Sequence, residues 1–143
     1  MSYEERGTWV YLVVSVGVYA AYVIVVLGRV TDPLTATAYQ VPLLWAIATA
    51  ILVAIVARIV VEIGAGMARG GGVDSRSDAR DREIDQRATQ HTWIIVALGA
   101  VTALLMALAQ WPYFWIANVI YLGFVLQAVA SSIVKLVLYR RGF

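Results

Sequence analysis

The stretch DSRSDARDREIDQRATQHT, residues 74–92, is the one long charged segment of a chain that is otherwise strongly apolar. Hydrophobic residues make up 62% of the 143 residues and charged residues 14%, whereas soluble domains average about 45–50% apolar and about 25% charged. A compact soluble core could not bury that much apolar surface. The composition therefore predicts an integral membrane protein that the charged segment divides into two halves.

Four apolar runs are long enough to cross a membrane, because a spanning helix needs roughly 20 apolar residues. They cover residues 8–27, 41–61, 92–109 and 114–138. The head MSYEERGT carries two glutamates where a signal peptide has a basic region, so the first run is expected to remain in the membrane. We predict an all-α fold, a single membrane domain over residues 1–143 that forms an integral membrane four-helix bundle.

The two halves are expected to be helical hairpins joined by a cytoplasmic hinge and charged helix over residues 64–91. Glycines at 64, 66, 70, 71 and 72 predict the hinge. No lysine followed by serine or threonine comes after them, so a phosphate-binding loop is not supported. The pairs Asp78–Arg82 and Glu83–Arg87 have the acid-before-base spacing that stabilises a solvated helix. The link of residues 110–113 is so short that it requires an antiparallel hairpin.

The charged segment also supplies the candidate docking residues for a cytoplasmic protein: Arg80, Arg82, Ile84 and Arg87. Ile84 and Ala88, four residues apart, form a narrow apolar stripe that could rest on headgroups or on another protein. The aspartates at 74, 78, 81 and 85 could pair with these arginines or hold a divalent ion, although carboxylates on one straight face diverge. His91 is either an ordinary interfacial residue or a pH sensor.

Polar residues inside the predicted spans are the candidate intramembrane site: Arg58, Glu62, Asn118, Gln127 and Ser131. Such residues mark functional sites by default. Arg58 and Glu62 lie near the end of their span, where they could instead form an interfacial pair. In the last span, Gly123, Gln127, Ser131 and Lys135 share one helix face, so they could serve as packing contacts or line a polar path.

Small residues recur at four-residue spacing, a pattern that lets helices approach closely in membranes. The series are Gly17 and Ala21; Ala46, Ala50 and Ala54; and Gly99, Ala103 and Ala107. Each predicts a face that packs against another helix.

Positive residues near the spans predict the orientation, because they accumulate on the cytoplasmic side. Of the 11 Lys and Arg residues, the predicted topology leaves only Arg29 outside. The other side holds Arg6, Arg58, Arg69, Arg76, Arg80, Arg82, Arg87, Lys135, Arg140 and Arg141. Both termini and the charged segment are therefore expected in the cytoplasm.

The stretch ARDREIDQRA, residues 79–88, is similar to the E-R-D-x-x-I-x-x-R stretch that precedes a transmembrane hairpin in a family of small prokaryotic membrane proteins of unknown function. The resemblance extends through WPYFWIANVIYLGFVL, residues 111–126, to the closing YRRGF. Ala79 stands where the family has an acid. The resemblance implies a four-span protein of the plasma (inner) membrane and supplies no activity or site residues.

The residues alone favour a non-enzymatic membrane protein that acts through contacts, as an accessory subunit, scaffold or regulator. Its expected partners are the lipid bilayer, a second copy or another membrane protein, and a cytoplasmic protein at residues 74–90. The alternative is a small oligomeric transporter or channel with a polar path along the last span. The sequence contains no cysteine, and it predicts no catalytic residues, cofactor, metal site or nucleic-acid surface.

Overall fold

A computed structural model describes residues 3–29, 38–68 and 75–140, which form four α-helices and no strand. The helices are α1 (Tyr3–Leu27), α2 (Gln40–Ala68), α3 (Ser75–Leu108) and α4 (Tyr113–Arg140). Each contains a window long and apolar enough to span a membrane. The all-helical fold and the four potential spans are therefore confirmed.

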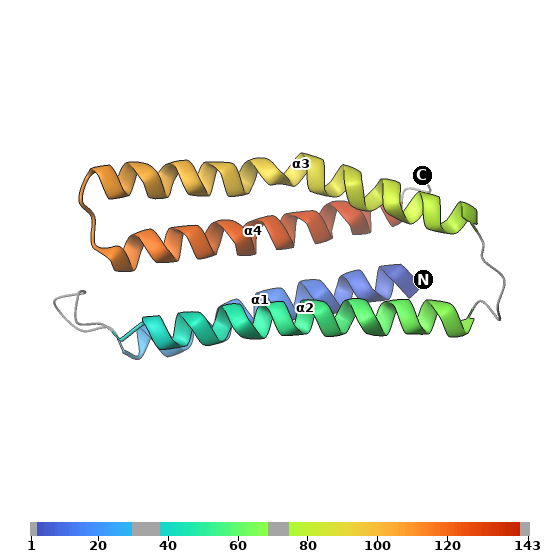
Figure 1. Ribbon diagram of the computed structural model, residues 1–143, viewed down its shortest axis with the longest axis horizontal. Helices are drawn as coiled ribbons and strands as arrows, with labels where there is room; N and C mark the ends of the chain where they lie inside the picture. The colour runs from blue at the N-terminus through green and yellow to red at the C-terminus, as the bar shows by residue number, and fades with distance from the viewer. Residues whose placement is uncertain (1–2, 30–37, 69–74, 141–143) are drawn as a thin grey trace.

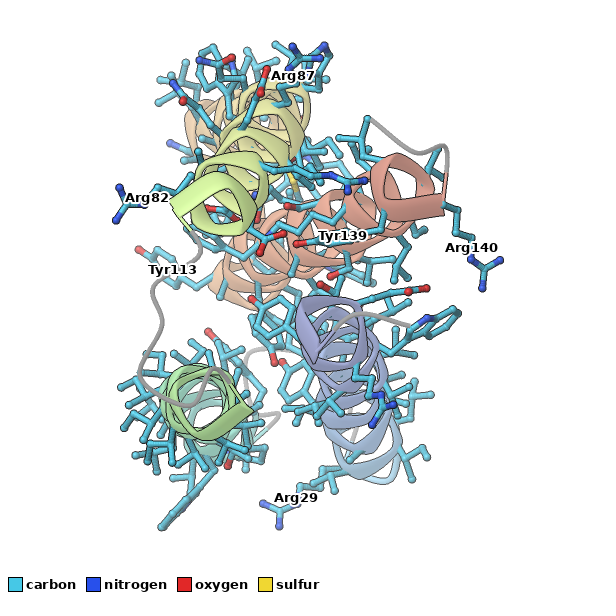
Figure 2. The ribbon with its side chains drawn as sticks, turned by 90° about the vertical axis from the view of Figure 1, so that its right-hand side faces the viewer. Arg29, Arg82, Arg87, Tyr113, Tyr139 and Arg140 are labelled. Carbon is cyan, nitrogen blue, oxygen red and sulfur yellow. The ribbon has the colours of Figure 1, made fainter. Side chains whose placement is uncertain are left out.

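The helices run antiparallel as two hairpins, α1–α2 and α3–α4 (Figure 1). The start of α1, the end of α4 and the charged start of α3 lie at one end of the bundle, which we call the terminal end; the turn between α3 and α4 lies at the opposite end. Helix α3 packs on α4, and α1 packs on both α2 and α4. The end-on view shows α2 beside α1, away from α3 (Figure 2). The α1–α4 interface consequently joins the two hairpins.

The turn between α3 and α4 explains why so short a link suffices. Gln110 takes a positive φ of 54°, its amide donates to the Ala107 carbonyl at 3.0 Å, and the Trp111 amide donates to the Met106 carbonyl at 3.0 Å. These bonds satisfy the last carbonyls of α3 as in a Schellman motif, with glutamine where glycine is usual. Pro112 then accepts from the Trp115 amide at 2.9 Å as α4 begins.

Two helix boundaries differ from the sequence prediction. Helix α1 begins at Tyr3 rather than at residue 8, and α2 continues to Ala68 through the two glycines at which the hinge was predicted to begin. A glycine inside a helix costs only about 1 kcal/mol relative to alanine, so Gly64 and Gly66 do not end α2. The remaining glycines of the predicted hinge lie outside the described residues.

Helix α3 combines the predicted charged helix and the predicted third span in one continuous helix of 34 residues. At 1.5 Å per residue it is about 51 Å long, far more than the roughly 30 Å of a hydrocarbon layer. Helix α3 is thus longer than a membrane span requires, and its charged first part lies at the terminal end of the bundle.

Candidate functional site

Helices α3 and α4 approach each other closely at two glycines. A Cβ added to Gly99 would lie 3.3 Å from the Cα of Gly123, which is tighter than an ordinary contact, and one added to Gly123 would lie 3.5 Å from the Cα of Gly99. Ala103 is also buried, whereas Ala107 is exposed. The predicted small-residue face of α3 is thus confirmed over Gly99 and Ala103 and ends before Ala107.

The small residues of the first hairpin behave differently. Ala46 of α2 is buried, but a Cβ added to Gly17 of α1 would meet no atom within 4 Å. Ala21, one turn further on, is exposed as well. The face of α1 that carries Gly17 and Ala21 therefore does not pack against another helix of the same chain.

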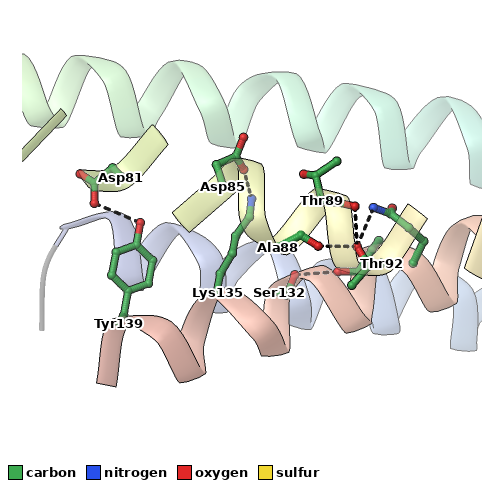
Figure 3. A network of polar contacts seen from close by, with 10 residues as sticks. Asp81, Asp85, Ala88, Thr89, Thr92, Ser132, Lys135 and Tyr139 are labelled. Carbon is green, nitrogen blue, oxygen red and sulfur yellow. Dashed lines mark hydrogen bonds and ion pairs between the residues drawn. The ribbon is translucent and has the colours of Figure 1, made fainter. Parts of the chain in front are cut away.

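A row of polar contacts connects the charged part of α3 to the end of α4 (Figure 3). The Tyr139 hydroxyl donates to Asp81 at 3.2 Å, and one turn deeper Lys135 forms an ion pair with Asp85. These pairs follow from the antiparallel packing, since Asp81 and Asp85 share the four-residue spacing of Lys135 and Tyr139. That equal spacing is a sequence signal that could have predicted both contacts.

The row continues into the predicted span. Gln127 Nε2 donates to Thr92 Oγ1 at 3.4 Å, and Thr92 Oγ1 donates to the Ala88 carbonyl at 2.8 Å. Ser132 of α4 donates to the carbonyl of Ala128 in its own helix at 2.8 Å. These bonds pair polar groups that would otherwise face apolar surroundings.

A second polar site lies on the opposite face of α4, against α1. The Tyr22 hydroxyl donates to Asn118 Oδ1 at 2.7 Å, and Asn118 Nδ2 donates to the Phe114 carbonyl at 2.7 Å. The Tyr22 and Tyr121 rings meet edge to face with centroids 5.2 Å apart, and Tyr19 completes the aromatic cluster. Asn118 was predicted from the sequence as an intramembrane polar residue, whereas its partner Tyr22 on α1 was not.

The candidate intramembrane residues are therefore not brought together into one site. Asn118 and Gln127 are nine residues apart, which at 100° per residue places them on opposite sides of α4. One contacts α1 and the other contacts α3. Ser131 is buried. The side chains of Arg58 and Glu62 lie outside those that the structure describes.

The charged segment is organised by its contact with α4. Of the two predicted pairs, Glu83–Arg87 is confirmed, with Arg87 Nη2 lying 2.6 Å from Glu83 Oε1, and Asp78–Arg82 involves a side chain outside the described residues. Ile84 is only 2% exposed and Ala88 is fully buried, so the apolar stripe that was expected to face headgroups or a partner packs inside the chain instead. Ile84 is removed from the candidate docking surface, because burying a large apolar side chain against α4 is more favourable than leaving it in water.

The other residues predicted to be functional in this segment are two arginines, the histidine and the aspartates. Arg80 and Arg82 are exposed, as a docking role requires. His91 Nδ1 donates to the Arg87 carbonyl at 2.7 Å and its side chain is exposed. The described residues include no group of three metal-binding side chains, and two of the four aspartates contact Tyr139 and Lys135. The side chains of Asp74 and Asp78 fall outside the described part of the chain.

The two ends of the chain also meet at the terminal end. Glu5 of α1 is 9% exposed and lies 3.9 Å from Arg140 Nε of α4. Asn118, Gln127, Lys135, Tyr139 and Arg140 of α4 thus each contact a polar group of another helix. Helix α4 therefore makes polar contacts with both of its neighbours, α1 and α3.

No family model, curated protein or solved structure matches this chain. The resemblance at residues 79–88 accordingly stays a prediction, and the function has to be argued from the geometry of the chain itself.

Proposed function

We propose that the protein is an accessory or scaffold protein of a prokaryotic plasma (inner) membrane, which acts by helix association with a second copy of itself or with another membrane protein. In this proposal the termini and the charged part of α3 face the cytoplasm. The protein carries out no reaction of its own.

The observation that supports the proposal is the contrast between two small-residue faces with the same spacing. Gly99 of α3 meets Gly123 of α4 at backbone distance, whereas Gly17 of α1 has no atom within reach of an added Cβ. In a membrane, close backbone packing drives association because lipid is as apolar as the helices themselves. The outward face with Gly17 and Ala21 is therefore suited to a helix from outside the chain.

The bonding of the polar residues counts against the alternative of a transporter or channel. A polar path along α4 requires Asn118 and Gln127 to face one continuous space. Asn118 instead accepts a hydrogen bond from Tyr22 of α1, and Gln127 donates one to Thr92 of α3. Their hydrogen bonds serve as contacts between helices, and such bonds average about 0.6 kcal/mol in membranes.

Cysteine crosslinking tests the proposal directly, because the chain contains no cysteine of its own. We expect Ala21→Cys to give a disulfide-linked dimer, or a crosslink to a second protein, in native membranes. Ala48→Cys is the matched control, since Ala48 is an exposed alanine on α2. Adding Gly17→Leu to Ala21→Cys should remove the crosslink because the new side chain keeps the partner backbone away.

Equal crosslinking at both positions would indicate random collision in the membrane. That result, or a strictly monomeric protein that recovers no membrane partner, would contradict the proposal.

A further inference from the structure

Over the described residues 79–90 of α3, every exposed side chain larger than alanine is polar or charged. Between residues 79 and 90 the large exposed side chains are Arg80, Arg82, Glu83, Asp85, Gln86 and Gln90. The large apolar side chain of this stretch, Ile84, is buried against α4. Protein interfaces place their binding energy in apolar and aromatic anchors at the centre. This surface lacks such an anchor, so it suits a charged ligand better than a folded protein.

The described acids of this surface are already engaged by partners within the chain. Asp81 contacts Tyr139, Asp85 pairs with Lys135 and Glu83 pairs with Arg87. Arg80 and Arg82 are exposed and have no bonded partner among the side chains that the structure describes. Within the described part of the chain, these two guanidinium groups are therefore open to an anion from outside.

The depth of these arginines in a membrane follows from the length of α3. Counting about 30 Å of hydrocarbon back from Leu108, at 1.5 Å per residue, places the membrane surface near Ala88. Arg82 lies six residues further out, or roughly 9 Å along the axis. A long arginine side chain at this position reaches the level of the lipid phosphates. Arg82 also points away from the bundle, on the side of α3 opposite Tyr139 and Arg140 (Figure 2).

From this geometry we propose that Arg80 and Arg82 bind the headgroups of anionic phospholipids at the terminal end of the bundle. A guanidinium donates two parallel hydrogen bonds to a phosphate, and a basic residue near an anionic membrane surface gains about fivefold in affinity. Because Ile84, Asp85 and Asp81 fix α3 on α4, the two arginines are held at headgroup level rather than on a loose tail. The inference does not depend on whether α1 associates with a partner.

Electron spin resonance of spin-labelled lipids tests this inference in the intact protein. The full chain is placed in phosphatidylcholine vesicles that contain traces of spin-labelled phosphatidylglycerol or spin-labelled phosphatidylcholine, and the fraction of each that is immobilised is measured. We expect a preference for phosphatidylglycerol that falls roughly fivefold or more in the variant Arg80→Gln/Arg82→Gln and that weakens with added salt.

Gln86→Ala is the matched control, since Gln86 is an exposed uncharged residue on the same part of α3. It should leave the preference unchanged, and helix content by circular dichroism should be the same in all three proteins. An equal preference in the wild type and the double variant would overturn the inference. So would an equal loss in Gln86→Ala, or capture of a soluble acidic protein by Arg80 and Arg82 with no preference between the two lipids.

Discussion

Both hairpins, α1–α2 and α3–α4, contain windows apolar enough to span a membrane, yet their helices pack together in different ways. The best spanning windows of α1 and α2 have mean hydropathies of 2.5 and 2.2, above the 2.0 and 1.8 of α3 and α4. The buried share of each window does not rise with its hydropathy. It is 28% for α4, the least apolar window, and only 6% for α2. The less apolar hairpin is the one that packs more tightly.

This difference shows what hydropathy does and does not decide in a membrane. Apolar surface is satisfied by lipid tails, so it drives insertion but not the association of one helix with another. Helix α4 packs well because Gly123 admits the backbone of α3 and because Gln127 and Lys135 bond to it. Helix α2 contacts the rest of the bundle chiefly through α1 and exposes most of its apolar surface.

The largest effect is expected for Ile84→Ala, which removes a side chain that is 2% exposed. A buried Ile→Ala change costs about 2–5 kcal/mol, so the charged part of α3 should separate from α4 and its amides should exchange faster. Ile63→Ala, at a 55% exposed position on α2, is the control. Hydrogen exchange followed by mass spectrometry measures both. Unchanged exchange at residues 79–91 in Ile84→Ala would show that this part of α3 is not held by packing.

A smaller effect is expected when leucine replaces the glycines of the two hairpins. Gly99→Leu drives a side chain into the backbone of α4 and should lower the unfolding free energy by about 1–3 kcal/mol, the usual cost of overpacking. Gly17→Leu should leave the unfolding free energy of the dilute monomer nearly unchanged, because its Cβ has open space. Unfolding in mixed detergent micelles measures both variants. Equal losses of unfolding free energy in Gly99→Leu and Gly17→Leu would mean that α3–α4 packs no more tightly than α1–α2.

The smallest effect is expected at the contact that joins the hairpins. Tyr22→Phe removes the hydroxyl that donates to Asn118 and should cost about 0.6 kcal/mol, and at most about 1.7 kcal/mol. Tyr19→Phe keeps its ring contacts with Tyr22 and Tyr121 and should cost less. The same micelle unfolding assay, with Asn118→Ala added as a double-mutant cycle, isolates the bond. A coupling energy of zero between Tyr22 and Asn118 would show that ring packing alone connects α1 to α4.

Much of the fold could be predicted from the sequence because membrane insertion depends on composition over long windows. The four helices that could span a membrane, the short hairpin turn at residues 110–113 and the Glu83–Arg87 pair all follow from local rules. The boundary at Gly64 was predicted wrongly, since a helical glycine weakens a helix without ending it. The charged segment was predicted to be a helix that leads directly into the third span, and α3 is continuous over both.

The candidate site was less predictable, because a residue's partner depends on how the helices are arranged. Sequence by itself determined that this chain has four apolar helices and that Ile84, Asn118, Gln127 and Gly17 are unusual within them. Only the tertiary structure decided that Ile84 faces inward, that Asn118 and Gln127 serve different neighbours, and that Gly17 faces outward. The physical reason is that lipid tails surround apolar side chains equally well on any face of a helix, so apolar surface does not choose between faces. Close backbone contacts and hydrogen bonds between helices select which faces meet.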